Sequence, residues 1–305
     1  MVSMNRLSTE RRGQIVACLV EGMSIRGTCR VTGVAKNTIV KLLCDLGEAC
    51  AEYQDVRLRD LTSERIECDE IWSFCYSKQK NVPEQFKDTP GYGDVSTWTA
   101  IDADTKLVPS WLVGERTNRD AYFFLVDLKS RLRGRVQLTT DGHKPYLTVI
   151  EPLFGADGVD FAMLHKMYGA SSHDSPEHTY SPAKCTGIDK RTIVGNPDPD
   201  LISTSYVERQ NLTMRMGMRR FTRLTNAFSK KIENLAHAVS LHYMHYNFAR
   251  PHQTLTKQFG RHTTPAMAAD KASHVWSVWE IAGLLDTPPR SNDPLPMRCW
   301  SVPSW

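Results

Sequence analysis

The sequence lacks several features that would assign it to a class directly. Its 8 cysteines include no Cys-x-x-Cys pair, so it predicts no zinc ribbon or similar closed cysteine site. No apolar run approaches the roughly 20 residues that span a bilayer. The N-terminal stretch MVSMNRLSTERRGQ also lacks the apolar segment of a secretory signal. These absences favour a cytoplasmic protein with no membrane partner, reduced thiols and no disulfide framework.

Positive charge is modest overall but concentrated in one part of the chain. The net charge is +4, which by itself does not indicate a nucleic-acid-binding protein. Residues 205–262 nevertheless hold ten Lys/Arg, five histidines and only two acidic residues, and the rest of the chain is net acidic. Such a concentration is typical of a phosphate-binding surface, with a solvated helix face as the alternative. Because few carboxylates balance these cations, we expect contact with nucleic acid.

The first sixty residues predict three helices in a row. These segments are residues 9–21, 24–33 and 35–60. A short helix, a turn at Gly33 and a following helix with a polar start are typical of a helix-turn-helix, with a plain three-helix bundle as the alternative. The side chains expected to reach base edges and phosphates are Lys36, Asn37, Thr38 and Lys41.

From residue 64 onward the hydrophobic pattern changes from helical to strand-like. The predicted order is three strands joined as a meander, then helix, strand, helix and strand, followed by further helices. The predicted strands are residues 65–76, 95–103, 107–113, 135–140 and 159–168, with helices at 118–133 and 145–154. This order predicts an α/β fold of the ribonuclease H-like kind, with a mixed five-stranded sheet flanked by helices. In that fold the first and fourth strands are parallel neighbours.

Three acidic residues are placed unusually along this pattern. Asp69 lies in the middle of an apolar strand, where a carboxylate is costly without a partner and a metal ion is a natural one. Asp141 follows the fourth predicted strand, although by itself it fits an ordinary loop equally well. Glu208 stands almost alone among cations, so it is either a metal ligand or the ion-pair partner of nearby arginines. Together the three predict a site for two Mg2+ or Mn2+ ions.

The chain resembles the insertion-sequence-one-type Asp-Asp-Glu transposases over roughly residues 8–270. The segments that carry the resemblance are IECDEIWSF at 66–74, TTDGHKPY at 139–146, SYVERQNLTMRMGMRRFTRLTNAFSKK at 205–231, YNFARPHQTL at 246–255 and TPAMAA at 264–269. The resemblance implies a ribonuclease H-like fold, an acidic triad of Asp69, Asp141 and Glu208, divalent metal, and cleavage at the ends of a mobile DNA element. Many relatives carry an N-terminal zinc-binding module, which this sequence lacks, so end recognition falls to the predicted helix-turn-helix.

This interpretation predicts double-stranded DNA as the partner, both the terminal inverted repeats of the element and the target. We expect a homodimer or larger assembly, because two ends are joined, and a nucleoid-associated location in the cytoplasm. Besides the N-terminal contacts, the residues expected to touch DNA are Asn211, Arg215, Arg219, Arg220, Lys230, Lys231, Arg250 and His252. For Arg250 and His252 a fold-stabilising turn is the alternative.

The predicted organisation has three parts. They are a helix-turn-helix domain at 1–60, a catalytic domain at 61–270 with a polar insertion at about 169–204, and a C-terminal tail at 271–305. Three other functions stay open. A DNA-binding regulator with an inactive nuclease fold would bind no metal, and a ribonuclease H-like nuclease without strand transfer would cut but never join. A structural nucleoid protein is disfavoured, because acidic residues lie where a basic binder would avoid them.

Overall fold

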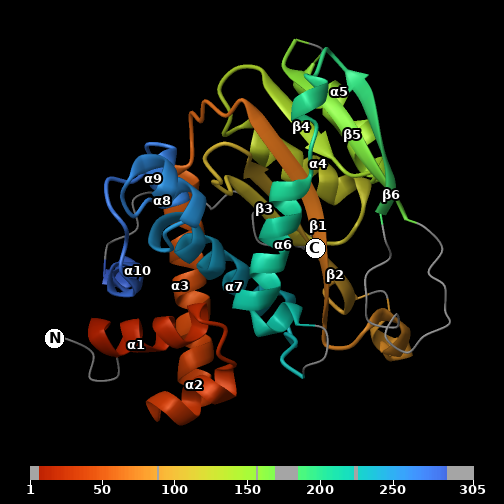
Figure 1. The fold of residues 1–305 in the computed structure, drawn as a ribbon. Helices are drawn as coiled ribbons and strands as arrows, with labels where there is room; N and C mark the ends of the chain where they lie inside the picture. The colour runs from red at the N-terminus through yellow and green to blue at the C-terminus, as the bar shows by residue number, and fades with distance from the viewer. Residues whose placement is uncertain (1–6, 88, 156, 169–184, 223–225, 287–305) are drawn as a thin grey trace.

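The computed structural model describes residues 7–87, 89–155, 157–168, 185–222 and 226–286. Its centre is an open, mixed six-stranded sheet with the strand order β3-β2-β1-β4-β5-β6 (Figure 1). The strands are β1 Arg65–Cys75, β2 Gly93–Asp102, β3 Ser110–Gly114, β4 Val136–Thr140, β5 Val159–Tyr168 and β6 Cys185–Val194. The α/β class predicted from the sequence is therefore confirmed.

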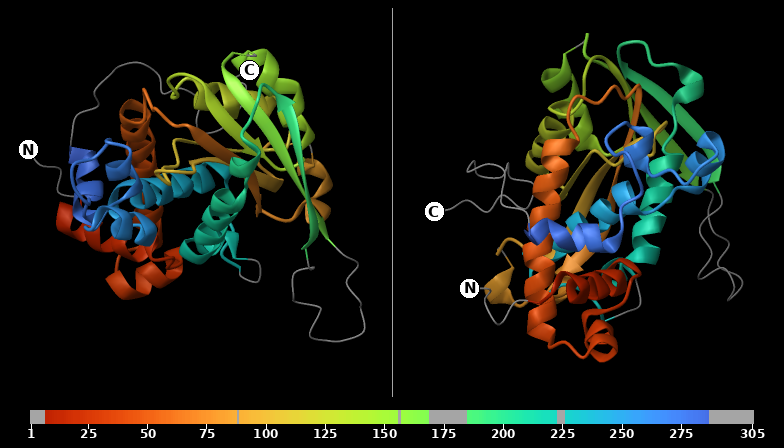
Figure 2. Two further views of the ribbon diagram at one scale, coloured as in Figure 1. Left: turned by 45° about the horizontal axis from the view of Figure 1, so that its top comes forward. Right: turned by 90° about the vertical axis from the view of Figure 1, so that its left-hand side faces the viewer.

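Helices cover both faces of this sheet (Figures 1 and 2). Side chains that alternate along the strands are buried on each side. Helices α4 (Asn118–Lys129) and α5 (Lys144–Phe154) share one core with Ile66 and Cys68 of β1. Ile71 of β1 belongs to the other core, which includes residues of α6 and α7. The bounds of these two helices are α6 Ser205–Gly217 and α7 Ile232–Met244.

The register of β1 fixes the layout of the sheet. It runs antiparallel to β2 and parallel to β4, with Cys68 opposite Thr140. The predicted parallel pairing of the first and fourth strands is thus confirmed. The order of the first five strands, with helices between β3, β4 and β5, is compatible with a ribonuclease H-like fold.

The sheet has six strands, so the predicted number of five is wrong. Strand β6 pairs antiparallel with β5 along the sheet edge and lies inside the segment predicted to be a polar insertion. Most of its residues are partly or fully exposed, because an edge strand has only one neighbour. Its polar composition therefore hides the alternation that identifies a half-buried strand. The rest of that predicted insertion, residues 169–184, lies outside the described residues.

The N-terminal helices pack against α7 and share its core. They are α1 Thr9–Val20, α2 Ile25–Thr32 and α3 Lys36–Arg57, and the turn between the last two contains Gly33 at φ 70°. Cys44 of α3 donates to Asn234 at the start of α7, and Gln54 donates to the carbonyl of Ser240 further along. The contacts advance along both helices together, so α3 and α7 lie parallel, with their N-terminal ends on the same side of the molecule.

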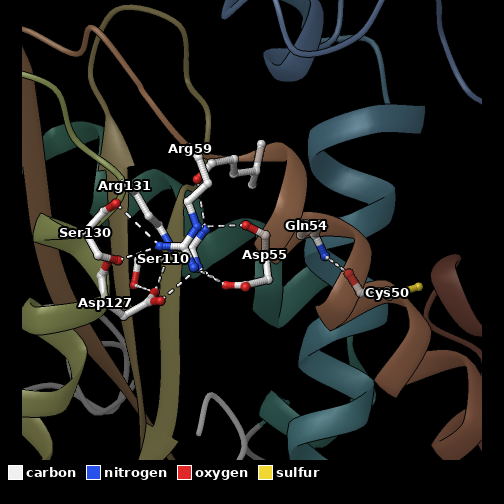
Figure 3. A network of polar contacts seen from close by, with 9 residues as sticks. Cys50, Gln54, Asp55, Arg59, Ser110, Asp127, Ser130 and Arg131 are labelled. Atoms are coloured by element: carbon white, nitrogen blue, oxygen red, sulfur yellow. Dashed lines mark hydrogen bonds and ion pairs between the residues drawn. The ribbon is translucent and has the colours of Figure 1, made fainter. Parts of the chain in front are cut away.

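A buried network of charges joins the end of α3 to α4 (Figure 3). The Arg131 side chain is 0% exposed and donates to both carboxylate oxygens of Asp127, at 2.9 and 2.8 Å, and to the carbonyl of Leu58 at 2.8 Å. Asp55 of α3 accepts from both Arg131 and Arg59. A buried guanidinium is tolerated only with such partners, so this network holds the N-terminal helices to the layer beside the sheet.

The C-terminal helices complete this packing. Helix α7 ends at Met244, and a π-helical turn, His245–Ala249, follows it. The remaining helices are α8 Gln253–Phe259, α9 Pro265–Ala268 and α10 Val278–Gly283. Part of the predicted tail packs on α1, where the Trp279 ring lies so close to Gly13 that an added Cβ would come within 2.6 Å of it. Within the described residues, the structure has no helix that is long and apolar enough to cross a membrane.

Candidate functional site

The acidic cluster lies where β4 ends beside the middle of β1. Because Cys68 pairs with Thr140 in parallel register, the next residues, Asp69 and Asp141, meet at the carboxyl end of β4. A ligand oxygen from each of Asp69, Glu70 and Asp141 lies within 4.8 Å of the other two. The sequence predicted that Asp69 and Asp141 would approach each other, and the structure brings them together.

Glu70 is the third member of this cluster and was not predicted. Its side chain is 2% exposed, accepts from the hydroxyl of Tyr146 at 2.6 Å, and pairs with Arg116 at 2.8 Å. Strand alternation assigns Glu70 to the face opposite Asp69. At this position, however, β4 has ended, so side chains from both faces of β1 reach the same edge. The signal available in the sequence was the consecutive pair Asp-Glu at 69–70.

Burial and mutual repulsion make these carboxylates harder to ionise. Burial, followed by the charge of Asp141, raises the pKa of Asp69 to about 6. Burial also raises the pKa of Glu70 to about 7, with a further contribution from Asp141, although the hydrogen bond from Tyr146 opposes the shift. A cluster that resists ionisation in this way gains from a cation placed among its oxygens.

Helix α6 contacts the cluster through Asn211, which is 5% exposed and donates from Nδ2 to Asp69 Oδ2 at 2.7 Å. Glu67, two residues before Asp69, holds the start of the same helix. Its Oε2 accepts from the backbone N–H groups of Tyr206 at 2.8 Å and Val207 at 3.0 Å. A carboxylate at a helix N-terminus satisfies otherwise unpaired N–H groups and matches the helix dipole. Burial still raises the pKa of Glu67 to about 7.

Glu208, the predicted third acid, lies outside the three-residue cluster. Its side chain is 44% exposed and pairs with Lys166 of β5, and its Oε1 accepts from Thr204 at 2.7 Å. It is nonetheless close enough for its charge to contribute to the raised pKa of Asp69. The structure therefore places Glu208 at the rim of the site, in an ion pair with Lys166 of β5 instead of the nearby arginines that the sequence offered as its alternative partners.

The donor set fits a hard divalent cation. Three carboxylates converge, and all their oxygens are of the kind that Mg2+ and Mn2+ prefer. The Oδ1 atom of Asn211 is buried and has no hydrogen-bond partner within the described residues, which leaves one more oxygen ligand beside Asp69. His143 Nε2 is likewise buried without a partner among the described residues, 4.0 Å from Glu70, and burial lowers the pKa of His143, which favours the neutral ring.

Six of the predicted DNA contacts surround one large cleft at the C-terminal end of α6, which we call the basic cleft. Its volume is about 1160 Å³, and it lies between α2, the start of α3, the end of α6 and the start of α7. The predicted residues that line it are Lys36, Asn37, Arg219, Arg220, Lys230 and Lys231. The structure thus brings together two groups of residues that are far apart in the sequence.

The other predicted DNA contacts are placed elsewhere. Thr38 and Lys41 are exposed on α3, where Lys41 pairs with Asp45, and Arg215 is partly exposed on the last turn of α6. Arg250 is exposed after the π-helical turn. The half-buried His252 lies near it, since the charge of Arg250 contributes, after burial, to its lowered pKa.

The functional interpretation depends on the geometry of the site. No protein-family model matches the sequence, and the search of curated proteins finds no match either.

Proposed function

We propose that this protein is a DNA transposase of the Asp-Asp-Glu type, which cuts DNA at the ends of a mobile element and joins those ends to a target. The observation that carries the proposal is the meeting of Asp69, Glu70 and Asp141 at the end of β4, in a fold compatible with the ribonuclease H-like class. The position of Asn211 on α6, donating to Asp69, supports it. In this proposal α2 and α3 act as a helix-turn-helix that recognises the DNA ends.

Asp69, Glu70 and Asp141 would hold the divalent ions, Mg2+ or Mn2+, with Glu208 as a further ligand from the rim. Bound metal would lower the pKa of the attacking hydroxyl and stabilise charge on the leaving 3′-oxygen. The protein's own part is to keep the carboxylates together and dry. Glu67 and Asn211 do this by fixing α6 against β1. Such a site needs no Ser, Cys or Lys nucleophile.

The proposed function is tested with DNA that carries the inverted repeats flanking the element's gene, a supercoiled target plasmid, and Mg2+ or Mn2+. We expect metal-dependent nicks at the repeat ends and covalent joining of the exposed 3′-ends to the plasmid. Nicking without joining would replace the proposal with a nuclease that lacks strand transfer. Specific binding of the repeats without any cleavage, in either metal, would replace it with a DNA-binding regulator.

A further inference from the structure

The basic cleft is one-sided in charge. Among the described residues that line it there are seven Lys/Arg and no Asp or Glu. The cationic lining residues are Arg26, Arg30, Lys36, Arg219, Arg220, Lys230 and Lys231. Surfaces that serve only solubility usually mix both signs, whereas a concave surface of one sign concentrates a ligand of the other. The ligand expected here is therefore an anion with charges spread over an extended length.

Most of these cations have no anionic partner of their own. Arg26, Arg30, Lys36, Lys230 and Lys231 make no ion pair with any other described residue. Arg220 makes no such ion pair either, and its side chain is more buried than theirs.

Arg220 is half-buried and donates from Nε to the hydroxyl of Ser229 at 2.9 Å. Burial lowers its pKa, and the groups that oppose this are the thiols of Cys75 and Cys44, not carboxylates. A guanidinium withdrawn from water without a carboxylate is unfavourable, and an anion in the cleft relieves that cost.

Two helix N-termini add to the positive potential. Helix α3 begins at Lys36 after Ala35, with no side-chain cap and no acidic residue in its first turn. Helix α7 begins after Lys231, again without a side-chain cap, although Glu233 lies in its first turn. Since α3 and α7 lie parallel, their unpaired N–H groups and dipoles meet at this cleft, where phosphate oxygens accept hydrogen bonds well.

The cleft suits a sugar–phosphate backbone better than unpaired bases. Sites for single strands rely on exposed aromatic rings on which bases stack. Among the described residues that line this cleft, Phe228 is the only Phe, Tyr or Trp. Its ring packs against Phe74 at a centroid distance of 5.0 Å. The remaining apolar lining residues, such as Met23 and Val31, are aliphatic.

Helix α6 connects the cleft with the acidic cluster. Asn211 on this helix touches Asp69, and Gly217 at its end lines the cleft. At about 1.5 Å per residue, these two positions are about 9 Å apart along the helix axis. Less than one turn of a DNA duplex separates them, so one duplex can lie against both.

We propose that the basic cleft binds the sugar–phosphate backbone of double-stranded DNA, with the N-terminal helices and the described lining residues at 219–220 and 230–231 holding one and the same duplex beside the acidic cluster of the same molecule. This rests on the proposed function in so far as that duplex is the DNA to be cut. Binding to the cleft and cleavage at the cluster are separable measurements, and each has its own point of failure.

The test is fluorescence anisotropy with a labelled 30-base-pair duplex over a range of salt concentrations. All proteins carry Asp69→Asn and Asp141→Asn, so that no cleavage occurs. The cleft variant adds Arg30→Gln, Lys36→Gln and Lys230→Gln, and the matched control adds Arg57→Gln, Arg133→Gln and Lys257→Gln. The control residues are exposed, and Arg57 lies at the opposite end of α3 from the cleft. Both sets remove the same charge, and thermal unfolding checks that both variants are folded.

Each lost phosphate contact lowers the slope of log Kd against log salt by about 0.9, so the cleft variant should lose about 2.7 of that slope. Extrapolated from about 1 M salt, this raises Kd about 170-fold near 0.15 M. The control should keep the parent slope. Equal loss in both variants, no duplex binding by the parent protein, or tighter binding of a single strand would overturn the proposal. If the variants bind DNA as expected but the wild-type protein never cuts DNA, only the proposed function is contradicted.

Discussion

Divalent metal should bind the acidic cluster much more tightly at about pH 8 than at about pH 6. Metal ligands must be deprotonated, and the pKa of Asp69 is raised to about 6 and that of Glu70 to about 7. At the lower pH about half of Asp69 and about a tenth of Glu70 are therefore ionised, whereas both are almost fully ionised at the higher pH. The product of these fractions gives an affinity increase of about 20-fold.

Isothermal titration calorimetry with Mn2+ measures this directly. Repeating the titration in two buffers of different ionisation enthalpy counts the protons released, which should be between one and two at about pH 6 and almost none at about pH 8. Glu70→Gln removes the more strongly shifted group, so its affinity should change only about twofold over the same range. Equal affinities at both pH values without proton release would refute the reasoning, since the carboxylates would then be either ionised already or not ligands.

Three further predictions follow from particular contacts. Burial raises the pKa of Glu67 to about 7 from its ordinary value of 4.5, so the stability it contributes is present below the lower value and is lost as pH rises through the higher one. Chemical denaturation without metal should show stability falling over this window, and falling less in Glu67→Gln; an unchanged profile would contradict this. Arg131→Met leaves the carboxylates of Asp55 and Asp127 without their shared cation. It should lower the free energy of unfolding, measured by denaturant titration, by about 3–5 kcal/mol. A loss below about 1 kcal/mol, as is usual at a surface pair, would show that the network is not buried in solution. The third experiment mixes two proteins: the cleft variant, here with its wild-type carboxylates, and an Asp69→Asn protein with an intact cleft. If the cleft and the acidic cluster of one molecule hold the same duplex, the mixture should not restore cleavage. Full recovery of cleavage would show that the two surfaces act from different molecules.

Much of the fold follows from the sequence because its pattern is strong there. The change from helical to strand-like periodicity near residue 64 gave the first five strands in their order, and the pairing of β1 with β4 follows from that order. Strand β6 was missed because an edge strand exposed along most of its length has no apolar face to repeat. Its pairing with β5, and not a pattern in its own residues, identifies it as a strand.

The site was predictable only where the order and pairing of the strands determine it. Asp69 and Asp141 come together because each lies at a fixed place on adjacent parallel strands. Glu70 joins them for a reason that alternation cannot supply, namely that β4 stops at Thr140, so that side chains from both faces of β1 reach the same edge. Lys166, the partner of Glu208, comes from β5, and no periodicity links the two.

The basic cleft shows the same limit at larger scale. Lys36 on one side and the cations at 219–220 and 230–231 on the other were predicted to touch DNA as two separate groups, whereas Arg26 and Arg30 were not predicted. Their union depends on the parallel packing of α3 against α7, through contacts such as those of Cys44 with Asn234 and Gln54 with Ser240. These contacts join residues from opposite ends of the chain, so only the assembled tertiary structure reveals the single surface.

The central claim is that the acidic cluster of β1 and β4 performs metal-dependent DNA strand cleavage. The most direct measurement compares nicking and joining of repeat-end DNA in Mg2+ by the wild type, Asp69→Asn, Asp141→Asn and Glu208→Gln, with duplex binding measured on the same samples. The account predicts that both aspartate variants lose cleavage by a factor of about 1000 or more, the scale of removing a main element of transition-state stabilisation, while they bind DNA as the wild type does. Aspartate variants that cut as fast as the wild type would contradict it.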